Sequence, residues 1–76
     1  MTPIRTPAEL GALVRTERRA QGLRQDELAL AAGTGRRFVS ELENGKATAR
    51  LEDVLSVVAA LGLTVDVRRP DGDARA

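Results

Sequence analysis

The chain of 76 residues contains no cysteine, histidine, tryptophan or tyrosine. These absences exclude disulfides, thiolate chemistry, imidazole acid/base catalysis and the usual zinc sites. A single phenylalanine is the only aromatic residue, so the core must be built from Leu, Val and Ala. Such a short chain has room for one small domain and too little volume for an active-site pocket. We therefore expect no enzyme, no metal site and no cofactor.

The overall charge is nearly balanced. Twelve Lys and Arg residues against eleven Asp and Glu residues leave a formal net charge of +1. A composition that is 42% hydrophobic and 30% charged is too apolar for a disordered chain and too often interrupted by charge for a membrane span of about 20 residues. No charged and then apolar leader opens the chain, so we expect a soluble cytoplasmic protein with no membrane partner.

Four helices are predicted from capping residues and from the spacing of apolar residues. Thr6-Pro7-Ala8-Glu9 has the form of a capping box that starts a helix at Pro7, and Gly22 follows as a left-handed cap. The other predicted helices are Gln25–Ala32, closed by Gly33, Arg36–Glu43, closed by Asn44-Gly45, and a fourth that begins at Leu51 and is closed by Gly62. In the fourth helix, the strongest 3.6-residue repeat of the chain runs through Leu51, Val54, Leu55, Val58 and Leu61.

After the fourth helix the apolar period changes to two. Leu63, Val65 and Val67 alternate with polar residues, which predicts a half-buried strand over residues 63–68. A lone strand leaves its backbone N–H and C=O groups unpaired, and so small a core needs further support. We therefore expect the strand to pair antiparallel with the same strand of a second copy, with the two-fold axis at Val65.

An alternative partner for this strand is the segment Ile4-Arg5 of the same chain. Pro3 and Pro7 leave little room for a ladder there, which favours the homodimer. Residues 1–69 thus form the predicted domain, and residues 70–76, which have no apolar content to anchor them, are predicted to be a disordered tail.

The second and third predicted helices, joined through Gly33, Thr34 and Gly35, follow the order of a helix-turn-helix. Arg36 and Arg37 stand in the first turn of the third helix, where the positive helix dipole costs each cation about 0.3–1 kcal/mol. Two cations in this place favour an anionic partner. DNA fits, because phosphates neutralise the helix end and the arginine fork can bond O6 and N7 of guanine. A solvated helix start that tolerates arginine is the alternative.

Three segments carry a resemblance to a known family: Leu23-Arg24-Gln25-Asp26-Glu27-Leu28-Ala29, then Ala32-Gly33, then Phe38-Val39-Ser40-Glu41-Leu42-Glu43-Asn44-Gly45-Lys46. Together they resemble the Xre or lambda-repressor-like helix-turn-helix family over about residues 10–63. The resemblance implies an all-α fold, a compact four-helix domain. A chain that carries a strand in place of the family's fifth helix is similar to HipB-like antitoxins, which form dimers through that strand, repress their own operon and bind a kinase toxin.

The resemblance also implies roles for single residues. Those implied to read base edges are Arg36 and Arg37, with Ser40 and Glu41 one turn further along. Glu41 has two readings of equal weight, an acceptor for the N4 amine of cytosine or an ion-pair partner of Arg37 at i+4. Arg18 and Glu43 correspond to a buried ion pair. The positions implied to contact phosphates are Gln25, Asn44, Lys46 and Arg50.

The sequence departs from the family pattern at two helix caps. Arg24 and Gly35 stand where the family usually has a capping Thr, Asn or Ser, which weakens both helix starts.

We predict a dimeric, nucleoid-associated repressor of a palindromic operator, acting as the antitoxin of a HipBA-like operon with a HipA-like kinase as partner. A stand-alone Xre-type regulator without a toxin is the alternative. The surfaces left for a toxin are the exposed faces of the first and fourth helices, including Arg15, Arg19 and Val57.

Overall fold

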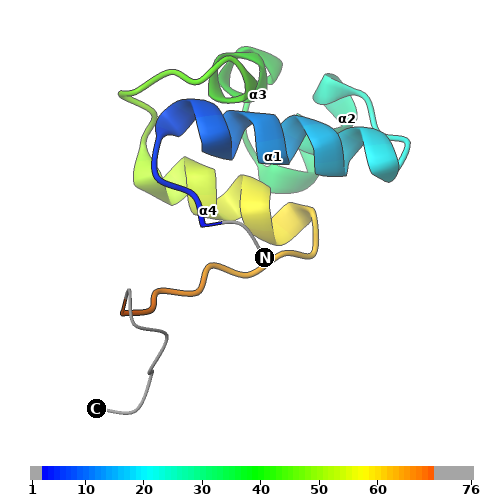
Figure 1. The fold of residues 1–76 in the computed structure, drawn as a ribbon. Coiled ribbons are helices and arrows are strands. Elements are labelled where there is room, and N and C mark those ends of the chain that lie inside the picture. Colours follow the sequence, from blue (N-terminus) through cyan, green and yellow to red (C-terminus); the bar gives the residue numbers. More distant parts are fainter. Residues whose placement is uncertain (1–2, 70–76) are drawn as a thin grey trace.

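The computed structural model describes residues 3–69, which contain four helices (Figure 1). Local signals place their ends as predicted. Thr6 Oγ1 accepts from the backbone N–H of Glu9 at 3.1 Å, and the Glu9 carboxylate accepts from the N–H of Thr6 at 3.1 Å, which closes the capping box. Gly33 has a φ of 74°, the left-handed conformation that ends the second helix. The helices are α1 (Pro7–Ala20), α2 (Gln25–Ala32), α3 (Arg36–Glu43) and α4 (Leu51–Ala60).

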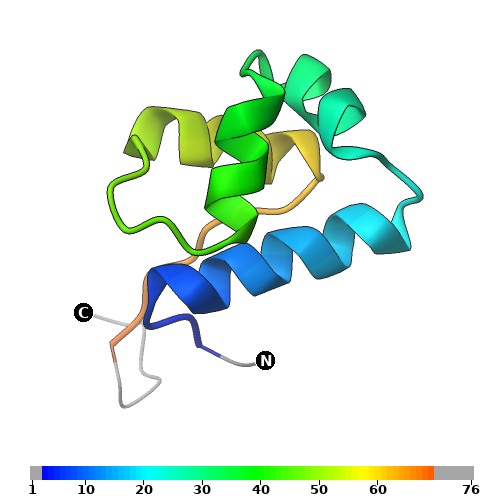
Figure 2. The ribbon, with the colours of Figure 1, turned by 90° about the horizontal axis from the view of Figure 1, so that it is seen from above.

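The four helices enclose one small core. α3 packs against α1 and α2, and α2 packs in turn against α4. Figure 2 shows α3 passing in front of α4, with its C-terminal end meeting α1. The predicted all-α, four-helix fold is therefore confirmed. The buried apolar residues come from all four helices and from the turn after α4: Val14, Leu28, Ala29, Val39, Leu42, Val54, Val57, Val58 and Leu61.

The buried face of α4 differs from the prediction. Val57, which we expected on an exposed face, is completely buried, whereas Leu51 and Leu55 are exposed. The helix is apolar on nearly all sides, so the spacing of its apolar residues does not decide which side faces the core. Val57 is therefore excluded from any surface that could bind a partner.

Gly11, in the middle of α1, marks the closest approach between α1 and α3. A Cβ atom built there would lie 2.7 Å from the carbonyl oxygen of Glu43 and closer still to that of Leu42. Only a residue without a side chain allows this approach. The backbone at the C-terminal end of α3 therefore lies directly against α1.

The predicted strand is not present as regular structure. Residues 63–69 form neither helix nor strand in the described chain, and after Leu63 they extend away from the helices (Figure 1). Leu63 packs against the core, whereas Val65 and Val67 are 60% and 89% exposed. A ladder to Ile4-Arg5 is also absent among residues 3–69. The pairing with a second copy stays a prediction, and the predicted tail, residues 70–76, lies outside the described residues.

Within residues 3–69, no helix has the length and hydrophobicity needed to cross a bilayer.

Candidate nucleic-acid interface

The third helix has one anchored face and one open face. Its anchored face carries Val39, Leu42 and Glu43, which are buried against α1 and α2. Arg36 and Arg37 project from the first turn, and the Arg37 side chain is 91% exposed. Arg36 forms no ion pair with any residue in the range 3–69. Gly35 supplies no side-chain cap, so the positive end of the helix dipole is left open together with two guanidinium groups.

Ser40 and Glu41 follow one turn further along and are half-buried. Glu41 binds two cations: Arg37 Nε donates to Oε2 at 3.3 Å, and Lys46 Nζ donates to Oε1 at 3.1 Å. The hydrogen bond from Lys46, reinforced by Arg37, holds the pKa of Glu41 below its usual range. Of the two roles predicted for Glu41, the structure shows the ion pair with Arg37 at i+4. Both carboxylate oxygens of Glu41 accept a hydrogen bond.

We expect Glu41→Gln to raise the affinity for duplex DNA of mixed sequence about two- to fivefold at low salt. The substitution removes a negative charge that neutralises Arg37 and Lys46 and would repel phosphates. A fluorescence-anisotropy titration measures the effect. Glu17→Gln, which changes the same charge at a residue bonded to Gln21, is the control and should leave affinity unchanged. A loss of affinity confined to sites with cytosine at one position would instead make Glu41 a base-reading residue.

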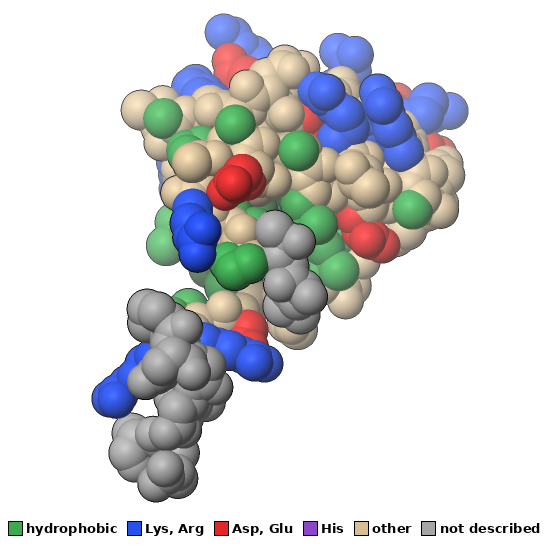
Figure 3. All heavy atoms as spheres, viewed as in Figure 1, with side chains coloured by type: hydrophobic (Ala, Val, Ile, Leu, Met, Phe, Trp, Pro, Cys, Tyr) green, Lys and Arg blue, Asp and Glu red, His purple; other side chains and the backbone are tan. Residues whose placement is uncertain are grey.

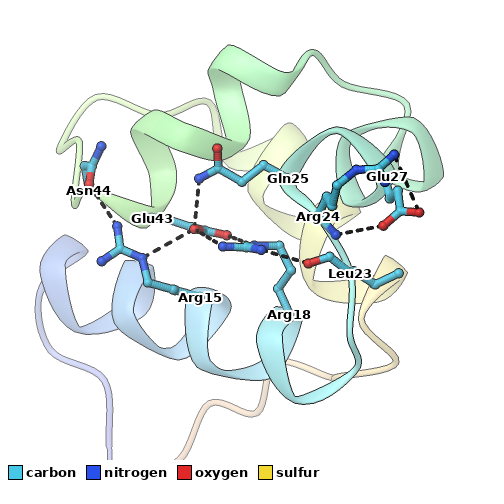
Figure 4. Close-up of polar contacts among 8 residues, drawn as sticks. All are labelled: Arg15, Arg18, Leu23, Arg24, Gln25, Glu27, Glu43 and Asn44. Carbon is cyan, nitrogen blue, oxygen red and sulfur yellow. Dashed lines mark hydrogen bonds and ion pairs between the residues drawn. The ribbon is translucent and has the colours of Figure 1, made fainter.

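A buried ionic network lies beneath the open face (Figure 4). Arg18 donates to Glu43 through Nε at 2.6 Å and Nη2 at 3.0 Å, and its Nη1 donates to the carbonyl oxygen of Leu23 at 2.8 Å. The side chain of Glu43 is fully buried and that of Arg18 is 10% exposed. The network therefore joins α1, the turn before α2, and the C-terminal end of α3.

The surroundings of Glu43 act on its pKa in opposite directions. Burial raises it, but hydrogen bonds from Arg18, Gln25 and Arg15 outweigh burial, and the net pKa lies below the usual range. Glu43 is therefore charged at neutral pH, although it is buried. Its charge fixes the positions of the donors around it.

Two of the four predicted phosphate contacts meet at this network. Gln25 Nε2 donates to Glu43 Oε1 at 3.1 Å, which leaves one of its two amide hydrogens available. Asn44, the residue that ends α3, accepts from Arg15 Nη2 at 2.9 Å through its side-chain oxygen. Its two amide hydrogens have no partner within residues 3–69.

The other two predicted phosphate contacts lie outside this network. Lys46 and Arg50 both line a shallow hollow of about 190 Å³, together with Glu41. Arg50 is itself exposed and pairs with Glu52 at 3.2 Å. The structure thus places the predicted residues in two groups, Gln25 and Asn44 at the buried network and Lys46 and Arg50 at the hollow.

Basic side chains are numerous at one edge of the surface, and others lie lower down beside the hydrophobic side chains (Figure 3). In the space-filling view, Lys and Arg side chains gather along the upper edge, where α3 lies in Figure 1. Hydrophobic side chains concentrate lower down, toward α4 and the extended segment (Figure 3). One edge of the molecule therefore suits an anionic partner.

Arg15, which we expected on an exposed face left for a partner protein, belongs to the buried network. Its side chain is 38% exposed, and its Nε donates to Glu43 Oε1 at 3.4 Å. A signal was present: Gly11, Val14, Arg15 and Arg18 follow one another at i, i+3, i+4 and i+7, the spacing of one helix face. An arginine within that stripe indicates a partner on the packed helix.

Comparison with known proteins agrees with this geometry. Residues 14–67 match the helix-turn-helix family. The chain is 54% identical over 67 residues to an uncharacterized HTH-type transcriptional regulator, y4mF, from Sinorhizobium fredii, and the match covers 88% of both chains.

Solved structures share the fold. The chain superimposes on a protein chain from a HipA-HipB-O2-O3 complex with a TM-score of 0.86 and 23% identity, covering 92% of this chain and 99% of the other. It also superimposes on the restriction-modification controller protein C.AhdI from Aeromonas hydrophila, with a TM-score of 0.70 and 31% identity over 76% of this chain and 84% of that one.

Proposed function

Because the chain belongs to the helix-turn-helix family of DNA-binding transcriptional regulators, we propose that it is a dimeric repressor that binds a palindromic operator. The observation that carries this proposal is the open face of α3. Arg36 and Arg37 are exposed at its N-terminal end, while Glu43 and its partners anchor the opposite face. Such a helix can enter the major groove without rearranging the domain.

The dimer rests on the exposed segment after α4. Val65 and Val67 are apolar and exposed, and extended backbone next to them has no partner within residues 3–69. Pairing with a second copy would cover both side chains and would set two α3 helices on one duplex. The half-sites would then lie about 34 Å apart, one turn of DNA. The solution mass of the protein, by light scattering, tests for two chains per particle.

The salt dependence of DNA binding tests the proposal as a whole. If each copy makes about three cationic phosphate contacts, a dimer releases about six counterions, and log affinity falls with log salt at a slope of about −5. We expect this slope on a duplex found by binding-site selection, measured from about 50 to 200 mM salt. An affinity that does not change with salt would exclude DNA as the partner.

Three single substitutions should separate base reading from phosphate binding. Arg36→Ala or Arg37→Ala should cost about 1–3 kcal/mol of binding to the selected site and relax its specificity. Lys46→Ala should instead weaken binding to all duplexes equally, because phosphates are the same in every sequence. Equal losses on every sequence from all three variants would refute this division of roles.

For the biological role, we propose an antitoxin that represses its own operon and binds a HipA-like kinase toxin. This rests on the shared fold with a chain from a HipA-HipB-O2-O3 complex. An adjacent gene for a kinase-like protein, followed by co-purification of the two chains, is the test. We expect a stable complex of both proteins.

A stand-alone regulator is the second candidate function. It is favoured by the 54% identical relative, whose name is that of a transcriptional regulator. The absence of a kinase-like neighbour, together with autonomous operator binding, would decide for this candidate.

A further inference from the structure

The buried network carries more positive than negative charge. One carboxylate, Glu43, faces two guanidinium groups, Arg15 and Arg18. Arg18 is buried, and its three nitrogens are all engaged. In the described part of the chain, Arg15 donates through Nε and Nη2 alone, and its side chain remains 38% exposed. The excess positive charge of the network therefore sits at Arg15, at the surface.

The groups around Arg15 are oriented toward an acceptor. Since Arg15 binds the side-chain oxygen of Asn44, the amide hydrogens of Asn44 are left to face away from the guanidinium. Gln25 donates one amide hydrogen to Glu43, and its second amide hydrogen remains available. Figure 4 shows Arg15 and Gln25, from α1 and α2, bonded to the carboxylate of Glu43, and Asn44, at the end of α3, bonded to Arg15. Donors on three elements are thus held by contacts to the same buried group or to each other.

We propose that Arg15 is a further phosphate-binding residue, which forms a single backbone-phosphate site with Gln25 and Asn44. The proposal rests on the proposed function, since it names the contact that this part of the surface makes with DNA. Asn44 follows Arg36, Arg37 and Ser40 at helical spacing, so the site continues the open face of α3 toward its C-terminal end. A planar fork that already binds an amide can turn its free N–H groups to a phosphate oxygen.

Substitution of Arg15 tests the proposal. The probe is a mixed-sequence duplex of about 20 base pairs, because a phosphate contact does not depend on sequence. We expect Arg15→Ala to weaken binding about tenfold and to make the log–log salt slope less steep by about 0.9 for each copy bound. Arg19→Ala is the matched control: Arg19 lies one turn further along α1, is exposed, and forms no ion pair with residues 3–69. It should change neither quantity.

Conservative variants separate a phosphate contact from a structural role. Arg15→Lys should keep the wild-type slope, because the charge remains, but bind less tightly, because an ammonium group cannot hold Asn44 and Glu43 together. If Arg15→Ala does not fold by circular dichroism, Arg15→Gln replaces it, with the same expected change of slope.

The outcomes are distinct. A lower affinity with an unchanged slope would make Arg15 purely structural and overturn the proposal, as would an Arg15→Ala variant that behaves like Arg19→Ala. Wild-type protein that binds no duplex would overturn the proposed function itself.

Discussion

Replacing Glu43 with alanine should lower the free energy of unfolding by about 3–5 kcal/mol. The substitution leaves the guanidinium of Arg18 buried without a counterion, and it removes the acceptor of Gln25 and Arg15. A chain of this length has a total stability of roughly 4–11 kcal/mol, so much of the protein should be unfolded. Urea denaturation followed by circular dichroism measures the loss.

The control is Glu52→Ala, which removes a carboxylate whose side chain is 81% exposed and which, among residues 3–69, pairs with Arg50 alone. It should change stability by less than about 0.5 kcal/mol. A double variant, Arg18→Met with Glu43→Leu, should lose less than the sum of the single losses, because no charge is then left buried. A Glu43→Ala variant as stable as Glu52→Ala would show that the network does not hold the helices together.

Glu43 also predicts an acid limit to stability. Its pKa in the folded protein lies below that of an unfolded chain, which is about 4.3. Its contribution is therefore complete above about pH 5 and is lost as pH falls through the unfolded and then the folded pKa. In Glu43→Gln this part of the acid dependence should be absent.

Replacing Gly11 with valine should cost about 3 kcal/mol or more. The new Cβ would lie 2.7 Å from the carbonyl oxygen and 2.9 Å from the carbonyl carbon of Glu43, distances at which backbone has to move. Helix propensity favours valine over glycine, so the whole loss comes from forcing α1 and α3 apart. Thermal unfolding measures it.

Ala12→Val is the matched control for Gly11→Val. It introduces the same side chain at an exposed neighbouring position and should cost only about 0.5 kcal/mol, the difference in helix propensity. Equal stability of the two variants would contradict the close backbone contact between α3 and α1. If Gly11→Val folds, we expect it to bind DNA less tightly, since the displaced residues include the end of α3.

The helices could be predicted because their ends are encoded locally. The Thr6–Glu9 box and the left-handed Gly33 act within a few residues of chain and need no tertiary contact. The open face of α3 followed from the same local reasoning, because Arg36 and Arg37 oppose the helix dipole.

Features that depend on packing between distant segments were harder to predict. α4 is apolar on several sides, and the packed structure buries Val57 and leaves Leu55 exposed. The role of Gly11 depends on backbone of α3 some 30 residues further along. Arg15 is a charged residue of the kind that usually lies in solvent. Its hydrogen bonds to Glu43 and Asn44 form because α1 packs against α3. The strand predicted at residues 63–68 is not formed in the described chain, and its pairing with a second copy stays a prediction, because backbone partners for it are not found within residues 3–69.

The most direct measurement of base reading by α3 uses the selected duplex with its half-site guanines replaced by 7-deazaguanine. This base lacks the N7 acceptor but keeps its Watson–Crick pairing. We predict that wild-type protein binds the modified duplex about tenfold more weakly than the natural one, whereas a variant with both Arg36→Ala and Arg37→Ala binds the two equally. Equal binding of both duplexes by the wild-type protein would contradict major-groove recognition by these arginines.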